Sequence, residues 1–303
     1  MYLPGRREVD AVNKRRFQVG QVNPRLLLLL LCWGPGCAVY NDSCPVGDPE
    51  VWGRINVELD IREQFVRQCE APVGNFITDA MLGYDYGLQD QNGESIIPRV
   101  ALINAGAIRD AVSCGAAGEE SRRSIPRGPV TDQDVFQLLP FQNTIVVASM
   151  TGAQLKDVLE WGVSNLNLPG EARQEGHFLQ VAGEGGIRID VDCSRSPQTL
   201  DSERRTIVDH GSRIVAVTLA GSLPLEPAGV YHVAVLEFMV GTGDLGVPND
   251  GFVAFHQPGI SLHDTHVPLT EVVRVWLGQS HPGDYPAVEG RLVYQQCGVT
   301  CGD

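Results

Sequence analysis

The sequence predicts an α+β fold, a single layered domain built on a mixed or antiparallel sheet. From Val51 onward, short apolar or alternating stretches that are typical of strands are interrupted by stretches with helical spacing, and turns rich in Gly, Pro, Asn and Asp separate them. These elements lack the regular strand–helix–strand rhythm of a doubly wound sheet. At 303 residues with 43% hydrophobic side chains, the chain can bury a sizeable core.

The predicted helices are recognised by their apolar spacing and their end signals. Asn75 is the candidate N-cap of the first. Thr131 opens the second, and Pro140 ends it. Thr151, with Gln154 three residues later, forms a capping box for the third. The expected helical ranges are 74–81, 131–139, 151–159 and 270–277.

The predicted strands are short runs of apolar and β-branched residues bounded by turn residues. The run at 144–150 is the most clearly β-branched of them. The run at 99–103 leads into a polar turn that contains glycine and ends at Arg109. The expected strand ranges are 99–103, 144–150, 187–191, 214–219 and 230–236.

Charge restricts the kind of partner. The formal net charge is −14, and the positive charge comes almost entirely from arginine. Such a balance repels a phosphate backbone and argues against nucleic-acid binding, although one local arginine pocket for a phosphate or carboxylate remains compatible with it. A small-molecule partner is therefore expected, and no nucleic acid.

Residues 1–40 are expected to form a basic leader with a signal-like apolar segment. Basic side chains precede the apolar run Leu26 to Trp33, which is too short to span a bilayer by itself. The run fits the centre of a secretory signal, with small residues for cleavage between 34 and 38. A disordered tail with a leucine cluster is the alternative. The signal predicts a secreted, extracellular or periplasmic protein without a membrane span.

Cysteine usage agrees with export. Removal of a signal leaves an even set, whose connectivity among fifteen pairings the sequence does not decide. Cys297 and Cys301 have a spacing that could close a small loop in the tail at 286–303, and a metal or redox pair is the alternative. Asn41 begins a glycosylation triplet. The remaining set is Cys44, Cys69, Cys114, Cys193, Cys297 and Cys301.

Common catalytic motifs are missing from the sequence. Neither a G-x-S-x-G nucleophile elbow nor a G-x-x-x-x-G-K-[ST] phosphate loop is present. The compact segment His263-Asp264-Thr265-His266 is interpreted as a solvated loop, with a metal site as the alternative, because a hydrolytic metal site needs further convergent ligands. No metal ligand is assigned.

Several segments together, in their order and spacing, resemble the C-terminal domain of the 5'-nucleotidase family over about residues 51–285. The resemblance implies a fold that recognises the nucleoside part of a substrate. In that family a separate calcineurin-like phosphatase domain holds two divalent metal ions and cleaves the ester, so no cofactor is expected here. The matching segments are Val57 to Asp60, Arg67 with Glu70, Gly74-Asn75, Asp79 to Met81, Ile103 to Arg109, Pro140-Phe141, Thr151-Gly152, Leu155, Leu159-Glu160, Phe178 to Gly183, and Tyr231 to Phe252.

The resemblance implies that Phe141 and Phe238 sandwich the base of the substrate. A stacked base contributes about 1–3 kcal/mol to binding and tolerates a change of base. Judged alone, each phenylalanine is more often a core residue, so the alternative is that both are buried in the hydrophobic core.

The turn after the strand at 99–103 is the second candidate contact. Asn104, Gly106 and Arg109 lie there, where glycine lets the backbone approach a ligand and arginine offers a rigid fork to phosphate or carboxylate. Arg67 matches a second arginine of the family's site. The alternative for both arginines is an ordinary solvated charge.

The resemblance also implies an aspartate that accepts ribose hydroxyls. Asp244 keeps the family's spacing from Phe238, and it is preferred. Asp250 keeps the local Asp-Gly-Phe triplet and is the second choice. Glu237 stands where the family often has asparagine, which leaves the base preference open.

No Gly-Asn-His segment and no early Asp-x-His is present, and about 50 residues precede the matching region. We therefore expect no nucleotide hydrolysis by this polypeptide alone. The leading interpretation is the recognition domain of a nucleotide-degrading phosphoesterase, which needs a metallophosphatase domain in cis or trans. The alternatives are a secreted stand-alone module that binds nucleosides or nucleotides, and a protein that keeps only the fold.

Overall fold

The structure is a computed structural model. The chain divides into two units, residues 1–37 and 38–303, and all described residues belong to the second. The apolar run at 26–33, Asn41 and Asp244 therefore lie outside the described part. The described ranges are 39–40, 44–110, 112–113, 123–166, 176–241, 249–279, 288–299 and 301.

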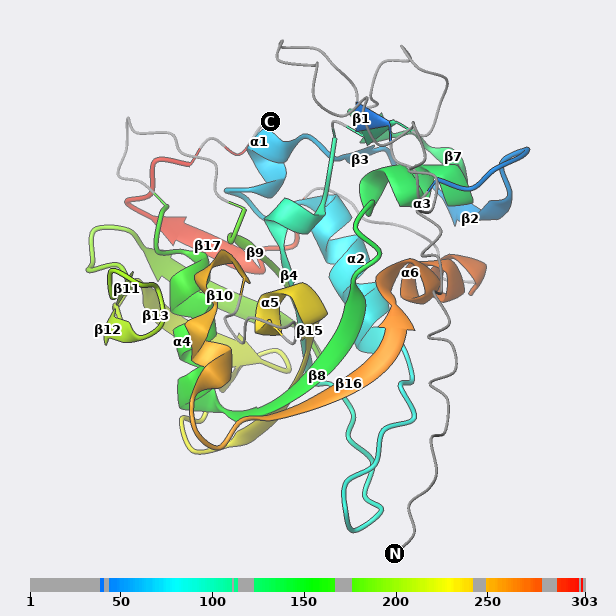
Figure 1. Ribbon diagram of the computed structural model, residues 1–303. Coiled ribbons are helices and arrows are strands. Elements are labelled where there is room, and N and C mark those ends of the chain that lie inside the picture. The colour runs from blue at the N-terminus through cyan, green and yellow to red at the C-terminus, as the bar shows by residue number, and fades with distance from the viewer. Residues whose placement is uncertain are drawn as a thin grey trace, which may run out of the picture. The chain divides into compact units, whose positions relative to one another are not determined.

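A five-stranded mixed sheet forms the centre of this unit (Figure 1). Its strand order is β16-β8-β15-β4-β9, and β15 pairs with β4 in parallel while the other pairs are antiparallel. All residues of β4 are buried, as expected for a strand covered on both faces. The strands are β4 (Val100–Asn104), β8 (Thr144–Thr151), β9 (Leu179–Gly183), β15 (Val230–Leu236) and β16 (Ser261–Pro268).

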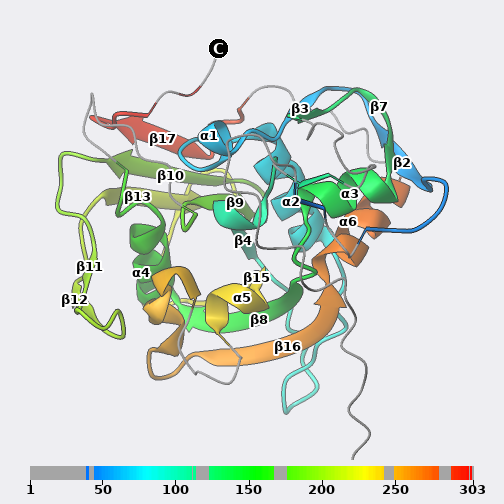
Figure 2. The same ribbon diagram turned by 45° about the horizontal axis from the view of Figure 1, so that its top comes forward.

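A second sheet of four strands lies next to β9 (Figure 2). Its order is β14-β13-β10-β17, with β10 and β17 parallel. Its strands are β10 (Ile187–Asp192), β13 (Ile214–Leu219), β14 (Leu223–Pro224) and β17 (Leu292–Gln295). The two-stranded ladders pair β1 (Val39–Tyr40) with β5 (Val112–Ser113), β2 (Val51–Ile55) with β7 (Gly128–Thr131), β3 (Leu59–Asp60) with β6 (Ser124–Ile125), and β11 (Thr199–Leu200) with β12 (Ile207–Asp209).

Helices pack against both sheets. Helix α2 contacts β4 and β9, α6 packs on α2, and α4 contacts β8, β13 and β15. Thr131 and Thr151 cap α3 and α4 with complete capping boxes. The helices are α1 (Glu63–Val66), α2 (Pro72–Gly83), α3 (Asp132–Leu138), α4 (Gly152–Gly162), α5 (Glu237–Val240) and α6 (Leu269–Gly278).

The predicted α+β class with a mixed sheet is confirmed, and two local expectations are wrong. Helix α2 begins at Pro72 after the N-cap Ala71, not at Asn75, because proline is suited to the first helical position. The amide of Asn75 is buried and donates instead to Glu70. The His263-Asp264-Thr265-His266 segment is part of strand β16, not a loop.

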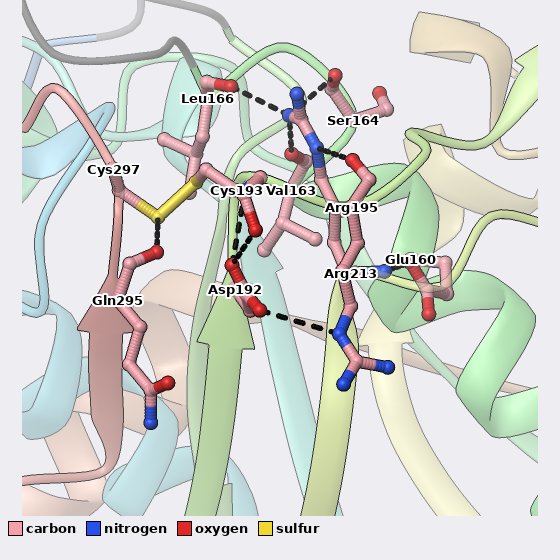
Figure 3. Close-up of a disulfide and its surroundings, with 11 residues drawn as sticks. Glu160, Val163, Ser164, Leu166, Asp192, Cys193, Arg195, Arg213, Gln295 and Cys297 are labelled. Atoms are coloured by element: carbon pink, nitrogen blue, oxygen red, sulfur yellow. Dashed lines mark hydrogen bonds and ion pairs between the residues drawn. A yellow bond between two sulfur atoms is a disulfide. The ribbon is translucent and has the colours of Figure 1, made fainter.

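Two disulfides attach the segment around β17 to the rest of the unit. Cys69 is bonded to Cys301 and Cys193 to Cys297, with Cα–Cα distances of 5.6 and 4.9 Å. Figure 3 shows the second bond beside the ends of β10 and β17. Cys44 is also disulfide-bonded. The expected small loop between Cys297 and Cys301 is therefore wrong, since the pairing of β17 with β10 brings each cysteine to a distant partner.

The buried Arg213 fastens the end of α4 to strand β13 (Figure 3). Its Nη1 donates to the carbonyl oxygens of Val163, Ser164 and Leu166 at 2.8, 2.8 and 2.5 Å. Its backbone N–H donates to Glu160 of α4 at 3.0 Å. Carbonyl groups just after a helix have no intrahelical partner, so this arginine supplies the missing donors.

Candidate functional site

One cleft of about 470 Å³ collects the residues that the sequence singled out. Every predicted contact residue lines it except Asp244, which lies outside the described residues. The space beside the two phenylalanines is thus not occluded. The lining residues are Arg67, Asn104, Gly106, Ala107, Arg109, Phe141, Asn143, Gly176, Phe238 and Asp250.

The topology explains why these residues meet. Strands β4 and β15 are parallel, so their carboxyl ends lie at the same edge of the sheet. Asn104 is the last residue of β4, and Phe238 follows the end of β15 within α5. The 3₁₀ turn Ala105–Ala107 then leads to Arg109, whose N–H donates to Leu138 at the end of α3.

The two phenylalanines are exposed although they are large and apolar. Phe141 is 57% exposed and Phe238 is 37% exposed. The chain at Phe141 leaves α3 through Pro140 and continues into Gln142, which has a left-handed φ of 50°. The core alternative is therefore wrong for both rings. Exposed aromatic rings in a cleft are available to stack on a planar ligand.

A polar pair lies deeper in the cleft. The amide of Asn104, which is 2% exposed, donates to Asp250 Oδ2 at 3.1 Å, while Asn104 Oδ1 is buried and has no hydrogen-bond partner within the described part of the chain. Burial raises the pKa of the Asp250 carboxyl, and the hydrogen bond from Asn104 and the nearby Arg204 and Arg67 oppose part of that rise. The pair presents a carboxylate acceptor to a hydroxyl-bearing ligand.

Residues outside the cleft lining stabilise the backbone conformation of Asp250. Its φ is 55°, a left-handed conformation that non-glycine residues seldom adopt. Trp161 Nε1 donates to the Asp250 carbonyl oxygen at 2.8 Å, and Arg204 Nη2 donates to the same oxygen at 3.3 Å. A Cβ on Gly251 would lie 2.7 Å from the Trp161 ring, so this position requires glycine. Trp161 and Arg204 were missed by the sequence analysis.

Glu63 on α1 is another missed residue, and it joins the two arginines of the cleft. Its Oε2 lies 2.6 Å from Arg67 Nη2, and its Oε1 lies 3.2 Å from Arg109 Nε. The guanidinium of Arg109 also lies 5.8 Å from the centre of the Phe141 ring. The i, i+4 spacing of Glu63 and Arg67 in the sequence indicates an ion pair on a helix, and this was the signal that could have identified Glu63.

Glu237, which stands where the family often has asparagine, is not among the residues that line the cleft. Thr144 Oγ1 donates to its Oε2 at 2.6 Å. Of the other residues missed from the sequence, Asn143 and Gly176 line the cleft. The carbonyl oxygen of Gly176 accepts a hydrogen bond from the Gly106 N–H at 2.8 Å, so two glycines lie next to each other in the lining of the cleft.

Within the described ranges, no group of three or more His, Cys, Asp or Glu side chains has the arrangement of a metal site. In strand β16, His263 Nε2 lies 3.3 Å from Ser149 Oγ, which is 2.8 Å from His232 Nδ1. His266 pairs with Asp264 at 3.2 Å. None of the described helices is long and apolar enough to cross a membrane.

The architecture is an α+β domain with a cleft at the carboxyl ends of β4 and β15. Residues 51–249 match the family model of the 5'-nucleotidase C-terminal domain, and the chain belongs to this family. The resemblance stated from the sequence is thereby confirmed. The boundary at residue 285 stays a prediction.

Related proteins extend well beyond the matched region. The chain is 37% identical over 244 residues to the trifunctional nucleotide phosphoesterase protein YfkN of Bacillus subtilis, covering 79% of this chain and 13% of that protein. It is 28% identical to the 5'-nucleotidase of Bos taurus, covering 82% of this chain and 38% of that protein. The crystal structure of the 5'-nucleotidase precursor from Thermus thermophilus superimposes with a TM-score of 0.60 at 30% identity, covering 81% of this chain and 39% of that one. The chain thus spans well under half the length of these relatives.

Proposed function

We propose that the cleft binds a nucleotide through its nucleoside part and that the domain is the substrate-recognition half of a 5'-nucleotidase-family phosphoesterase. The observation that carries the proposal is the meeting of two exposed phenylalanines, an Asn–Asp pair and two arginines around one cleft. Its volume of about 470 Å³ is typical of a site for a small organic ligand.

Each group of the ligand has a matching group in the cleft. The base stacks between Phe141 and Phe238, and Asp250 accepts hydrogen bonds from ribose hydroxyls. Arg67 and Arg109 take the anionic ester end, because a guanidinium presents several N–H donors in one plane. Asn104 holds the Asp250 carboxylate in place.

In this proposal the chain binds and orients the ester, and the chemistry requires a metallophosphatase domain in cis or trans. Two divalent metal ions in that domain would activate water and stabilise charge on the phosphate. Holding the ester in a reactive orientation is itself a large contribution to rate, because it replaces a chance encounter with a fixed geometry.

A stand-alone binding module is the second candidate. It is favoured by the fact that every described residue lining the cleft belongs to one unit, residues 38–303. Phosphate release from AMP in the presence of added Zn²⁺ or Mn²⁺ separates the two candidates when it is measured on the native protein, with its intact mass determined in parallel. Release by a longer native protein supports the recognition-domain proposal, and binding without release by a protein of this size supports the module.

The disulfides of Cys44, Cys69 and Cys193 support a location outside the cytoplasm, because such bonds persist in oxidising compartments. We place the protein in an extracellular or periplasmic space. Non-reducing and reducing peptide maps of the native protein test this assignment, since free thiols at these positions would contradict it.

Replacing either of the two phenylalanines that line the cleft tests the binding proposal directly. Phe141→Ala and Phe238→Ala each remove one stacking face, so each is expected to weaken adenosine and AMP binding by about 1–3 kcal/mol in isothermal titration calorimetry. Leu223→Ala is the matched control, because this exposed apolar side chain lies outside the cleft. The proposal fails if the wild-type protein binds neither ligand at millimolar concentration.

A further inference from the structure

A carboxylate that the proposed function does not use lies beside Arg67 and Arg109, the two arginines of the cleft. Glu63 is 18% exposed and does not line the cleft, yet it contacts both arginines that do. The Glu63 backbone N–H donates to Oδ2 of Asp110, the neighbour of Arg109, at 3.1 Å. This hydrogen bond fixes the backbone of Glu63 at the start of α1 close to Arg109.

The two guanidinium groups come from separate segments and would repel each other without this carboxylate. Arg67 follows α1, and Arg109 follows the 3₁₀ turn after β4. A carboxylate can accept from two guanidinium groups at once, one on each oxygen. Glu63 directs one oxygen to each guanidinium group, with Oε2 paired to Arg67 and Oε1 paired by charge to Arg109.

Hydrogen bonding in this cluster is incomplete. Glu63 Oε1, Arg67 Nε and Arg109 Nε are buried and have no hydrogen-bond partner among the described residues, so the 3.2 Å approach of Glu63 to Arg109 is an ion pair without hydrogen-bond geometry. Arg109 Nη1 donates to the Gly106 carbonyl oxygen at 3.4 Å, which is long for a hydrogen bond. Buried polar groups are normally paired, so this cluster retains donor capacity. Site hydrogen bonds often reach good geometry only when the ligand is bound.

We propose that Glu63 is a positioning residue that sets the two arginines to receive one anionic group of the ligand and thereby makes the cleft prefer nucleotides to nucleosides. The inference rests on the proposed function and extends it to the charged end of the ligand. Glu63 acts through Arg67 and Arg109 and does not touch the base or the ribose. Its loss is expected to affect phosphate-bearing ligands selectively.

Glu63→Gln is the informative substitution, because it keeps the shape and one acceptor oxygen while it removes the charge. AMP affinity is expected to fall about tenfold, since charge-assisted pairs are about twice as strong as neutral ones and the freed arginines repel each other. Adenosine affinity is expected to stay within about twofold, because adenosine carries no phosphate. Glu63→Asp keeps the carboxylate on a shorter stem and is expected to give an intermediate loss of AMP binding.

Calorimetry with AMP and adenosine on the whole chain measures this selectivity, with Glu184→Gln as the matched control. Glu184 is also paired to an arginine, Arg99, but at 63% exposure and outside the cleft. Circular dichroism checks that each variant is folded, and Glu63→Asp answers the question if Glu63→Gln does not fold.

The possible results separate this inference from the proposed function. A selective loss of AMP binding supports the inference. Tighter AMP binding in Glu63→Gln would mean that Glu63 competes with the ligand's anion, and an equal loss for both ligands would mean a general structural role. Either result, or no change, overturns the inference while nucleoside binding stands. Binding of neither ligand by the wild-type protein overturns both.

Discussion

At Asp250, different neighbours hold the backbone and the side chain. Trp161 and Arg204 donate to the carbonyl oxygen, while Asn104 donates to the carboxylate in the cleft. A left-handed backbone costs about 1–3 kcal/mol when the residue is not glycine, so such a residue persists only where its surroundings determine its conformation. These donors supply that support at a residue we assign to ligand binding.

The raised pKa of Asp250 makes nucleoside binding sensitive to acid. The protonated carboxyl no longer offers a charged acceptor, and protonation begins at a higher pH than the ordinary carboxyl pKa of 3.8 because burial raises the pKa. Adenosine affinity, measured by calorimetry from about pH 7.5 down to about pH 4.5, is therefore expected to fall in the wild-type protein. Asp250→Asn is neutral throughout, so it is expected to bind weakly and independently of pH. An equal pH slope in both proteins would assign the titration to another group.

At the scale of helices, capping boxes fix where α3 and α4 begin. The Thr131 hydroxyl accepts from the Asp134 N–H at 3.2 Å, and the Thr151 hydroxyl accepts from the Gln154 N–H at 3.3 Å. Helix α3 leads to Phe141, which lines the cleft, and helix α4 carries Trp161, which holds the backbone of Asp250, so both caps lie on elements that support the cleft.

Removal of either cap is expected to destabilise the fold. Thr131→Ala and Thr151→Ala each leave helix N–H groups without a partner, and each is expected to lower the free energy of unfolding by about 0.5–2 kcal/mol in urea titrations. Thr199→Ala is the control, because Thr199 is exposed on β11 and caps no helix. If the two cap variants unfold like the control, the caps do not contribute to stability.

The sequence was most informative where local patterns determine structure. The strand at 144–150 and the box at Thr151 follow from β-branched runs and capping chemistry, and both are present. Asn104 and Arg109 were identifiable as a pair because they share one turn. The start of α2 was misplaced because two cap signals compete within four residues, and Pro72 has the stronger effect on the backbone.

Tertiary contacts account for what the sequence did not reveal. Arg204 reaches Asp250 from the turn between β11 and β12, and nothing in that turn's composition indicates its neighbour. The Glu63–Arg67 spacing predicts only a surface pair, and the contact with Arg109 exists because the turn after β4 folds back beside α1. Strand β17 pairs in parallel with β10, and such a pairing has no local signature.

Across the whole unit, residues 288–299 connect the second sheet to Glu70, three residues after Arg67, and to α2. Glu70 accepts from the N–H groups of Glu289 and Leu292, and Tyr294 Oη accepts from the Glu70 N–H. Arg291 pairs with Asp79 of α2 at 2.7 Å. One of the two disulfides joins Cys301 to Cys69, two residues after Arg67, and the other joins Cys297 to Cys193, which directly follows β10.

The two disulfides are expected to differ in their effect on binding. Cys69→Ser with Cys301→Ser and Cys193→Ser with Cys297→Ser are each expected to lower stability by about 2–4 kcal/mol, measured by thermal unfolding. Cys69 is two residues from Arg67, so only the first double variant is expected to weaken AMP binding as well. Equal AMP affinity in both variants would show that the first bond does not support the arginines.

Cys69 and Cys301 are 232 residues apart in the sequence, and this separation affects the order in which the contacts around the cleft form during folding. During synthesis the segment with Arg67 emerges before Glu289, Leu292 and Cys301, which follow it by more than two hundred residues. Contacts between such distant parts of a chain form slowly, because a long loop must close before they can stabilise anything. The contacts of Glu70 and Cys69 with the C-terminal segment thus form only after that segment has been synthesised, and until then the growing chain depends on its local hairpins and helices.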